Sequence, residues 1–244
     1  MIQSVFTVIE NRPLSPKAWR MRLQGDVSAI CGPGQFADLA LDGFFLRRPF
    51  SVCDADSDSF TILYERAGQG TEAMTALPVG SRLDVLTGLG NTFDRTEAGD
   101  HPLLIAGGSG ASPLYWLARM LRAEGKAVTV ILGFSSKEEV FYEEEFRALG
   151  CEVLVTTEDG SYGIPGFVTA AMDRPCSYFY ACGSKLMLRE VCRRAETGGQ
   201  LSMAQRLGCG FGVCMGCTCR TVSGGKRLCK DGPVLRKEEV LWDD

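Results

Sequence analysis

The sequence predicts an α+β protein with more than one domain: an antiparallel β-barrel, then an α/β domain with a parallel sheet, then a small C-terminal segment. Two changes of pattern along the 244 residues carry this prediction. Short strands separated by turns fill the first part, and apolar strands alternating with helices fill the second. The last part is rich in cysteine and glycine and follows neither pattern. We therefore expect domains at residues 1–98, 99–197 and 198–244.

The barrel is predicted from segments of strand-forming residues broken by glycine, proline or aspartate. One helix interrupts them where Thr71 follows Gly70, and Pro78 ends its pattern. The expected strands are residues 4–10, 18–24, 35–41, 49–54, 60–65 and 82–88, and the expected helix is residues 71–78.

The second domain is predicted from the regular alternation of strands and helices, which places helices on both faces of a parallel sheet. Its expected strands are residues 102–108, 127–134, 151–157 and 176–183. Its expected helices are residues 114–125, 138–150 and 185–196.

Composition excludes several classes of function. The net charge is -4 and the basic residues are scattered in pairs, which argues against a nucleic-acid-binding surface. No apolar run approaches the roughly eighteen residues of a membrane span, and the N-terminus lacks the pattern of a secretion signal. We therefore expect a cytoplasmic protein without a membrane partner, in which the 11 cysteines do not form a disulfide framework.

The C-terminal segment contains the stretch CGFGVCMGCTC. Four residues separate Cys209 from Cys214, two separate Cys214 from Cys217, and Cys229 follows later. This is the plant-type spacing of a [2Fe-2S] cluster, with three thiolates on one loop and a fourth further along the chain. Glycines between the cysteines fit a loop that wraps closely around an inorganic core.

Two alternatives exist for this segment. A structural zinc site more often shows two close CxxC pairs, whereas only Cys214 and Cys217 form such a pair here. Cys219 lies two residues past Cys217 and could replace Cys217 or Cys229, although we expect it not to be a ligand.

Two further motifs indicate nucleotide binding. The string LLIAGGSGASPLYWLAR runs from a strand through a glycine turn into a helix, so backbone N–H groups would face a pyrophosphate. A tight turn without a ligand would explain the same residues. In LRRPFSV, Arg48 and Phe50 share one face of a strand and Arg47 points the other way, so Arg48 could meet a phosphate.

The order of these motifs, with RPFS first, GGSGASP next and CG after a late strand, resembles the ferredoxin-NADP reductase superfamily. The added segments CGFGVCMGCTC and LCKDGPVL, with GLGNTF and TEDGSYGIPGFVT, resemble the electron-transfer subunits of the two-subunit dihydroorotate dehydrogenases. The likeness extends over nearly the whole chain.

The resemblance implies FAD, a [2Fe-2S] cluster and NAD as cofactors, with site residues as follows. FAD would be held by Arg48, Pro49, Phe50, Ser51, Leu63, Tyr64, Glu65, Gly70 and Thr71, although Glu65 is acidic where a basic residue is expected. NAD would face Gly107, Gly108, Gly110 and Pro113, and Cys182 and Gly183 would lie near the nicotinamide, Cys182 being the candidate catalytic residue. The cluster ligands would be Cys209, Cys214, Cys217 and Cys229. The residues alone leave NAD and NADP open.

These cofactors together predict an electron-transfer function, because a flavin can pass single electrons from a cluster on as hydride to NAD+. No residues remain for an (α/β)₈ barrel of about 250 residues that would oxidise a carbon substrate. The resemblance implies a separate FMN-containing catalytic subunit, in a heterotetramer with two copies of each chain. The alternatives are a reductase subunit of a sulfite reductase, hydrogenase or ferredoxin-NADP system and, in a different class, a zinc-stabilised interaction module.

Overall fold

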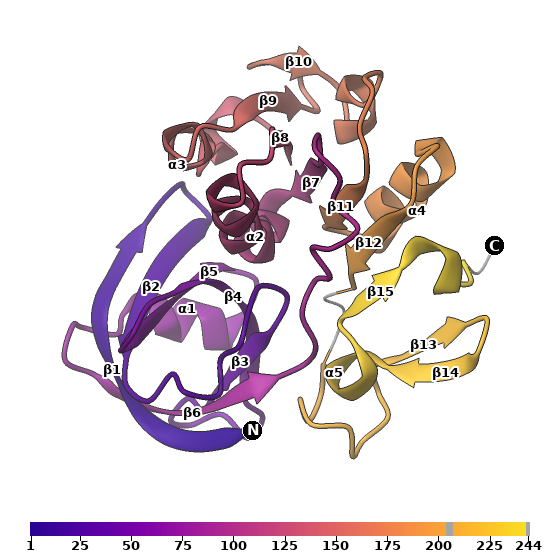
Figure 1. Cartoon of the computed structure of the whole chain (residues 1–244). Helices are drawn as coiled ribbons and strands as arrows, with labels where there is room; N and C mark the ends of the chain where they lie inside the picture. Colours follow the sequence, from indigo (N-terminus) through magenta and orange to yellow (C-terminus); the bar gives the residue numbers. More distant parts are fainter. Residues whose placement is uncertain (204–206, 243–244) are drawn as a thin grey trace.

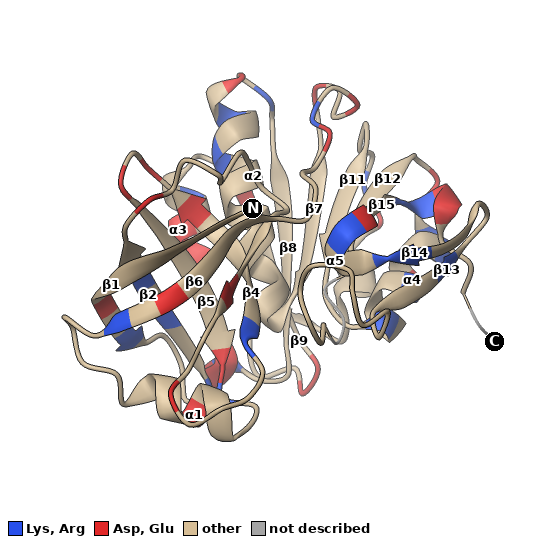
Figure 2. Cartoon of the chain, turned by 90° about the horizontal axis from the view of Figure 1, so that it is seen from below, with Lys and Arg blue, Asp and Glu red and all other residues tan. Residues whose placement is uncertain are grey.

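The computed structural model describes residues 1–203 and 207–242. Figure 1 shows a β-barrel at one side, a twisted sheet covered by helices beside it, and a smaller C-terminal unit against both. Lys and Arg are interspersed with Asp and Glu over the face seen in Figure 2. Within the described ranges, no helix is long and apolar enough to cross a bilayer.

The first part of the chain forms the predicted barrel. Its six strands close through antiparallel pairs in the order β1-β2-β5-β4-β3-β6. Alternate side chains such as Phe6, Met21 and Ile62 fill the interior and are fully buried. The strands are β1 (Ile2–Pro13), β2 (Ala18–Gln24), β3 (Phe36–Leu39), β4 (Arg48–Ala55), β5 (Ser59–Glu65) and β6 (Arg82–Leu89).

The predicted helix within the barrel is α1 (Gln69–Thr75), and Asn11 of β1 fixes its C-terminal end. The Asn11 amide donates to the carbonyls of Met74 (2.8 Å) and Leu77 (3.0 Å). Its Oδ1 accepts a hydrogen bond of 2.8 Å from the hydroxyl of Tyr64 on β5. One half-buried amide therefore joins two barrel strands to the helix.

The second part forms a seven-stranded sheet in the order β10-β9-β8-β7-β11-β12-β15, parallel except for β15. Leu104 of β7 packs with α2 and α3 on one face, whereas Ile105 packs with α4 on the other. The strands are β7 (Leu103–Gly107), β8 (Thr129–Phe134), β9 (Glu152–Thr157), β10 (Ile164–Pro165), β11 (Phe179–Cys182), β12 (Gly199–Ser202) and β15 (Val234–Arg236). The helices are α2 (Ala111–Ala123), α3 (Glu143–Ala148) and α4 (Lys185–Arg194), with 3₁₀ turns η1 (Gly108–Gly110), η2 (Lys137–Glu139) and η3 (Val168–Ala171).

The helix predicted at residues 138–150 is wrong in its first half. The turn η2 is followed by Tyr142 in the left-handed conformation (φ 64°), and only then does α3 begin. Phe141 and Tyr142 are both buried in one core cluster. The left-handed turn at Tyr142 thus separates the two buried rings from α3.

The C-terminal segment is held to both other parts. Strand β15 pairs with β12, and the Asn91 amide after the barrel exchanges two hydrogen bonds with Val234, donating to its carbonyl (2.8 Å) and accepting from its N–H (2.9 Å). Strands β13 (Thr218–Thr221) and β14 (Gly224–Arg227) form a hairpin, followed by α5 (Leu228–Asp231) and the turn η4 (Lys237–Glu239). Strands β12 and β15 follow residue 198 in the chain but belong to the sheet of the second domain. The domain boundary expected between residues 197 and 198 therefore stays a prediction.

Replacing Asn11 by alanine should lower the free energy of unfolding by about 1–3 kcal/mol, because two carbonyls and the Tyr64 hydroxyl lose their partner. Chemical denaturation measures the change. Tyr64→Phe removes only one of the three hydrogen bonds and should cost less. An Asn11→Ala protein within about 0.5 kcal/mol of wild type would contradict this account of the α1 anchor.

Candidate functional site

A cavity of about 1060 Å³ lies between the barrel and the sheet. Both predicted nucleotide motifs open into it, which the sequence alone could not establish because they are some 60 residues apart. The predicted residues that line it are Pro49, Phe50, Ser51, Leu63, Tyr64, Glu65, Thr71, Gly107, Gly108, Gly110, Cys182 and Gly183. Arg48, Gly70 and Pro113 are predicted site residues that lie behind this lining.

On the barrel side, Arg48 of β4 is held at the start of α1. Its guanidinium lies 5.1 Å from the centroid of the Phe44 ring. A Cβ atom on Gly70 would come within 2.6 Å of Arg48 Nε, so a glycine is needed for the two to meet. Thr71 Oγ1 accepts N–H groups of Ala67 (2.9 Å) and Gly68 (3.2 Å) and fixes the same turn. The structure thus brings Arg48, Gly70 and Thr71 together, as a phosphate group would require.

The neighbouring wall of the cavity is aromatic. The Phe50 and Tyr64 rings lie 5.9 Å apart, and Trp19 lies 6.4 Å from Tyr64. Arg47 points the opposite way, as predicted, and its Nη2 is 3.0 Å from Asp84 Oδ1. Flat apolar rings beside a cation suit a ligand with a planar ring system and a phosphate, which is what FAD offers.

On the sheet side, β7 ends in the glycine turn η1, which leads directly into α2. A Cβ atom on Gly110 would lie 2.1 Å from the carbonyl oxygen of Cys182, so only glycine allows this contact. Gly107 and Gly183 both pack against Met187. The turn and the end of β11 therefore form one surface at the N-terminus of α2, a position suited to a dinucleotide phosphate.

Cys182, the predicted catalytic residue, is fully enclosed at this surface. Burial raises the pKa of its thiol to about 12, despite a hydrogen bond with Ser202. The thiol is therefore protonated at neutral pH, and a catalytic role for Cys182 stays a prediction. A contact between Cys182 and the nicotinamide stays a prediction.

The side chain of Glu65 extends from the barrel to the glycine turn of the second domain. Its Oε1 accepts a hydrogen bond of 2.9 Å from the N–H of Ser109, in the middle of the glycine turn. Its contact across the cavity is a feature that the sequence did not predict. A carboxylate thus occupies a position on the surface predicted to take a phosphate.

Two of the predicted cluster ligands, Cys217 and Cys229, bring their sulfur atoms together, and the sulfur of Cys209 lies against the backbone of Cys214. Cys217 Sγ and Cys229 Sγ are 3.3 Å apart, and Cys209 Sγ accepts the N–H groups of Val213 (3.3 Å) and Cys214 (3.5 Å). Among the described residues, no three His, Cys, Asp or Glu side chains surround one point, as a single metal ion would need. Two sulfurs for each of two irons is the donor set of a [2Fe-2S] cluster, so these residues fit that group.

Backbone N–H groups of this loop stabilise the negatively charged thiolate of Cys209. Burial alone would raise the pKa of Cys209, but the N–H groups of Cys214, Phe211 and Val213 lower it to about 6. Burial and the neighbouring Cys217 raise the pKa of Cys229 to about 12. Cys219 lies in β13, and its Sγ contacts the Arg220 carbonyl at 3.6 Å.

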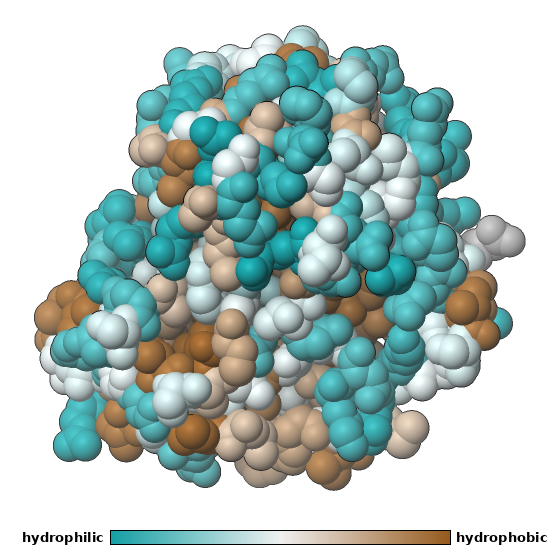
Figure 3. All heavy atoms as spheres, in the orientation of Figure 1, coloured by the Kyte–Doolittle hydropathy of each residue, from teal (hydrophilic) through white to brown (hydrophobic). Residues whose placement is uncertain are grey.

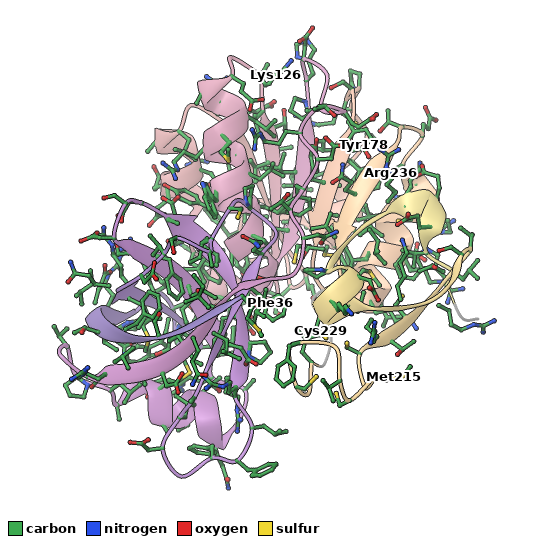
Figure 4. All side chains as sticks on the ribbon, turned by 60° about the horizontal axis from the view of Figure 1, so that its bottom comes forward. Phe36, Lys126, Tyr178, Met215, Cys229 and Arg236 are labelled. Atoms are coloured by element: carbon green, nitrogen blue, oxygen red, sulfur yellow. The ribbon has the colours of Figure 1, made fainter. Side chains whose placement is uncertain are left out.

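The cluster loop, which we define as residues 209–217, rests directly on β3 of the barrel. A Cβ atom on Gly210 would lie 2.4 Å from Asp38 Oδ2, and Gly210 has φ 79°. Phe36 of β3 packs in one core cluster with Cys217 and Cys229, and Figure 4 shows it beside Cys229. The ladder pairs Asp38 with Pro49 and Phe36 with Ser51, so the strand under the cluster loop is bonded to the RPFS strand.

Asp38 is a site residue that the sequence did not predict. Its carboxylate is buried, and neither oxygen has a hydrogen-bond partner within the described part of the chain. Burial raises its pKa to about 7, although Arg47 lowers it. An acidic residue inside the apolar stretch FADLAL is the signal that could have identified it.

Gly70→Ala should weaken FAD binding about tenfold or more, ~1.4 kcal/mol, because the new methyl group displaces the Arg48 guanidinium. Gly68→Ala is the matched control, since a Cβ atom there meets nothing within 4 Å. Titration of flavin-free protein with FAD, followed by flavin fluorescence, measures both. Equal affinities of the two variants would refute the proposed role of Arg48.

Alanine at Cys209, Cys214, Cys217 or Cys229 should remove the iron–sulfur cluster, whereas Cys219→Ala should retain it. Iron, acid-labile sulfide and visible absorption of the anaerobically purified proteins give the answer. A Cys219→Ala protein without iron, or a Cys229→Ala protein with a full complement, would reassign the fourth ligand.

Comparison with known proteins agrees with this geometry. Residues 204–241 match the model of the iron-sulfur cluster binding domain of dihydroorotate dehydrogenase B. The chain is 37% identical to the dihydroorotate dehydrogenase B (NAD(+)) electron transfer subunit of Shouchella clausii over 98% of both chains. It is 38% identical to the subunit of the same name from a Geobacillus species over 99% of both.

Solved structures place the fold among the reductases. One, from a study of the NADH-dependent reduced ferredoxin-NADP oxidoreductase and flavin-based electron bifurcation, matches with a TM-score of 0.88 and 26% identity over 98% of this chain and 90% of that one. The ferredoxin NADP+ reductase of Neisseria gonorrhoeae, with bound FAD and NADP, has a TM-score of 0.68 and 18% identity over 78% of this chain and 89% of that one, which supports the fold alone. The sequence resemblance is thereby confirmed, and the chain belongs to the family of dihydroorotate dehydrogenase B electron transfer subunits.

Proposed function

We propose that this chain is the electron-transfer subunit of an NAD-dependent dihydroorotate dehydrogenase, receiving single electrons at a [2Fe-2S] cluster and delivering them through FAD to NAD+. The observation that carries this proposal is the β3–β4 ladder. Its β3 strand supports the cluster loop, and its β4 strand carries the RPFS motif, which opens into the cavity shared with the dinucleotide turn.

The chemistry requires this arrangement. Nicotinamide exchanges a hydride with two electrons, a [2Fe-2S] cluster moves one electron at a time, and a flavin can do both. Neighbouring strands of a sheet lie about 4.8 Å apart, so the β3–β4 ladder would hold the cluster and the flavin on adjacent strands.

The residues of this chain divide the work as follows. The Arg48 guanidinium would bind phosphate, and the Phe50–Ser51 backbone with Tyr64 would orient the flavin ring toward the cavity. The N–H groups of the glycine turn would hold the dinucleotide phosphates, and the buried Cys182 would lie beside the nicotinamide. The loop N–H groups around Cys209 would stabilise the charge on the cluster sulfurs.

The partner would be the catalytic subunit that oxidises dihydroorotate, carrying FMN, in an assembly with two copies of each chain. The tip of the cluster loop supports this. Phe211, Val213 and Met215 are 45%, 73% and 62% exposed, which leaves apolar side chains in water. The lower edge of the molecule in Figure 3 is apolar where Figure 1 places this loop. A partner seated there would exclude water next to the cluster.

The C-terminal tail, considered from sequence as part of that contact, packs mainly on its own chain. Trp242 joins the core cluster that contains Cys229, and the Leu241 N–H donates to the Arg220 carbonyl at 3.1 Å. None of the 11 cysteines, all of which lie in the described part of the chain, forms a disulfide, which supports the proposed cytoplasmic location.

Anaerobic spectroscopy tests the function. The purified chain should contain FAD, iron and sulfide, and NADH should bleach its flavin absorption at once. Dihydroorotate alone should cause no change, because the proposal assigns its oxidation to the partner, and adding the FMN-containing partner should make dihydroorotate bleach the flavin and cluster. Protein without FAD, or oxidation of dihydroorotate by this chain alone, would contradict the proposal.

A further inference from the structure

Glu65 places a negative charge on the surface that should receive the dinucleotide. The residue ends β5 of the barrel, and its side chain reaches across the cavity to the turn η1 of the other domain. Its Oε1 accepts the N–H of Ser109 at 2.9 Å. The same oxygen would lie 3.0 Å from a Cβ atom on Gly108, which has φ 52°. The carboxylate therefore sits against the glycine turn itself.

The position of this turn at the N-terminus of a helix favours binding of an anion. It precedes the 13-residue helix α2, whose first N–H groups have no partner within the helix and carry partial positive charge. A phosphate normally satisfies such groups, and a carboxylate satisfies them in the same way. Glu65 is thus an anion, supplied by the protein, at the position of a ligand anion.

The surrounding charges do not neutralise Glu65. Lys17, the cation whose pKa is raised by Glu139 and, more weakly, by Glu65, makes its ion pair with Glu139. The cavity is also lined by the carboxylates of Glu158 and Glu190, against only one further cation, Arg194. A dinucleotide with two phosphates therefore enters an acidic cavity.

Glu65 is also not needed to hold the two domains together. The Ser112 hydroxyl donates to the Ser51 carbonyl at 3.1 Å, and Arg119 pairs with Asp54 and donates to the Ala55 carbonyl at 3.1 Å. These contacts join α2 to β4 independently of Glu65. The Glu65–Ser109 hydrogen bond can break while the domains stay in place.

We propose that Glu65 is an internal competitor for the dinucleotide, bound to the Ser109 N–H until a phosphate of NAD(H) replaces it. This inference rests on the proposed function, in which the cavity takes NAD(H). NAD(H) can bind only when the carboxylate has left the turn. The apparent dissociation constant is therefore the intrinsic one divided by the fraction of molecules in which the turn is free of Glu65. The carboxylate returns when the nucleotide leaves, which favours release of the product NADH.

Equilibrium binding of ADP-ribose, which carries the two phosphates but cannot accept hydride, tests the proposal on the FAD-loaded chain. Glu65→Ala should bind ADP-ribose about five- to tenfold tighter than wild type, because the competitor is gone. Glu65→Gln keeps the length but not the charge and should also bind more tightly, by a smaller factor. Isothermal titration calorimetry gives the dissociation constants, and the flavin spectrum verifies that each variant is folded and loaded.

Glu158→Ala is the matched control, because it removes a carboxylate from the same cavity without touching the turn. If net charge alone mattered, it would equal Glu65→Ala, and that result would overturn the competitor role. Weaker binding of ADP-ribose by both Glu65 variants would overturn the competitor role and make Glu65 a nucleotide ligand. Unchanged binding would also overturn it and make Glu65 a structural contact between the two domains. If neither wild type nor any variant binds ADP-ribose or NADH, the proposed function fails as well, which separates the two failures.

Discussion

The ladder between β3 and β4 is the constraint on which the rest of the structure depends. Only a few residue pairs form it, and they pair Phe36 with Ser51 and Asp38 with Pro49. The cluster loop lies on the β3 side and the flavin motif lies on β4. Because a ladder fixes the spacing of its strands, backbone hydrogen bonds and not a flexible linker would set the separation of a cluster and a flavin bound at these residues.

Other contacts fix the position of the C-terminal segment relative to the barrel and the parallel sheet. Strands β12 and β15 tie the cluster segment to the parallel sheet, and Asn91 ties it to the end of the barrel. Gly110 and Gly210 allow backbone approaches that any larger residue would block. Asp38, a buried carboxylate without a hydrogen-bond partner among the described residues, is a cost to stability of the kind that collects at functional sites.

Local pattern sufficed to predict much of this protein. The strands of the barrel, the glycine turn and the cysteine spacing are set by residues near one another in the chain, whereas FAD and NAD were expected from the family resemblance. Contacts between distant segments could not be predicted in this way. Glu65 and Ser109 are 44 residues apart, and Asp38 meets Gly210 from the opposite end of the chain. The left-handed turn at Tyr142, whose ring packs in the core beside Phe141, also departs from the helix that local pattern predicted.

A crystal structure of the FAD-loaded protein, with diffraction data collected at the iron absorption edge, tests the central claim most directly. The account predicts two iron peaks, one between Cys209 and Cys214 and one between Cys217 and Cys229, beside Phe36, with the flavin ring against Phe50 and Ser51. A single metal peak, or a flavin ring bound away from the β3–β4 ladder, would contradict it.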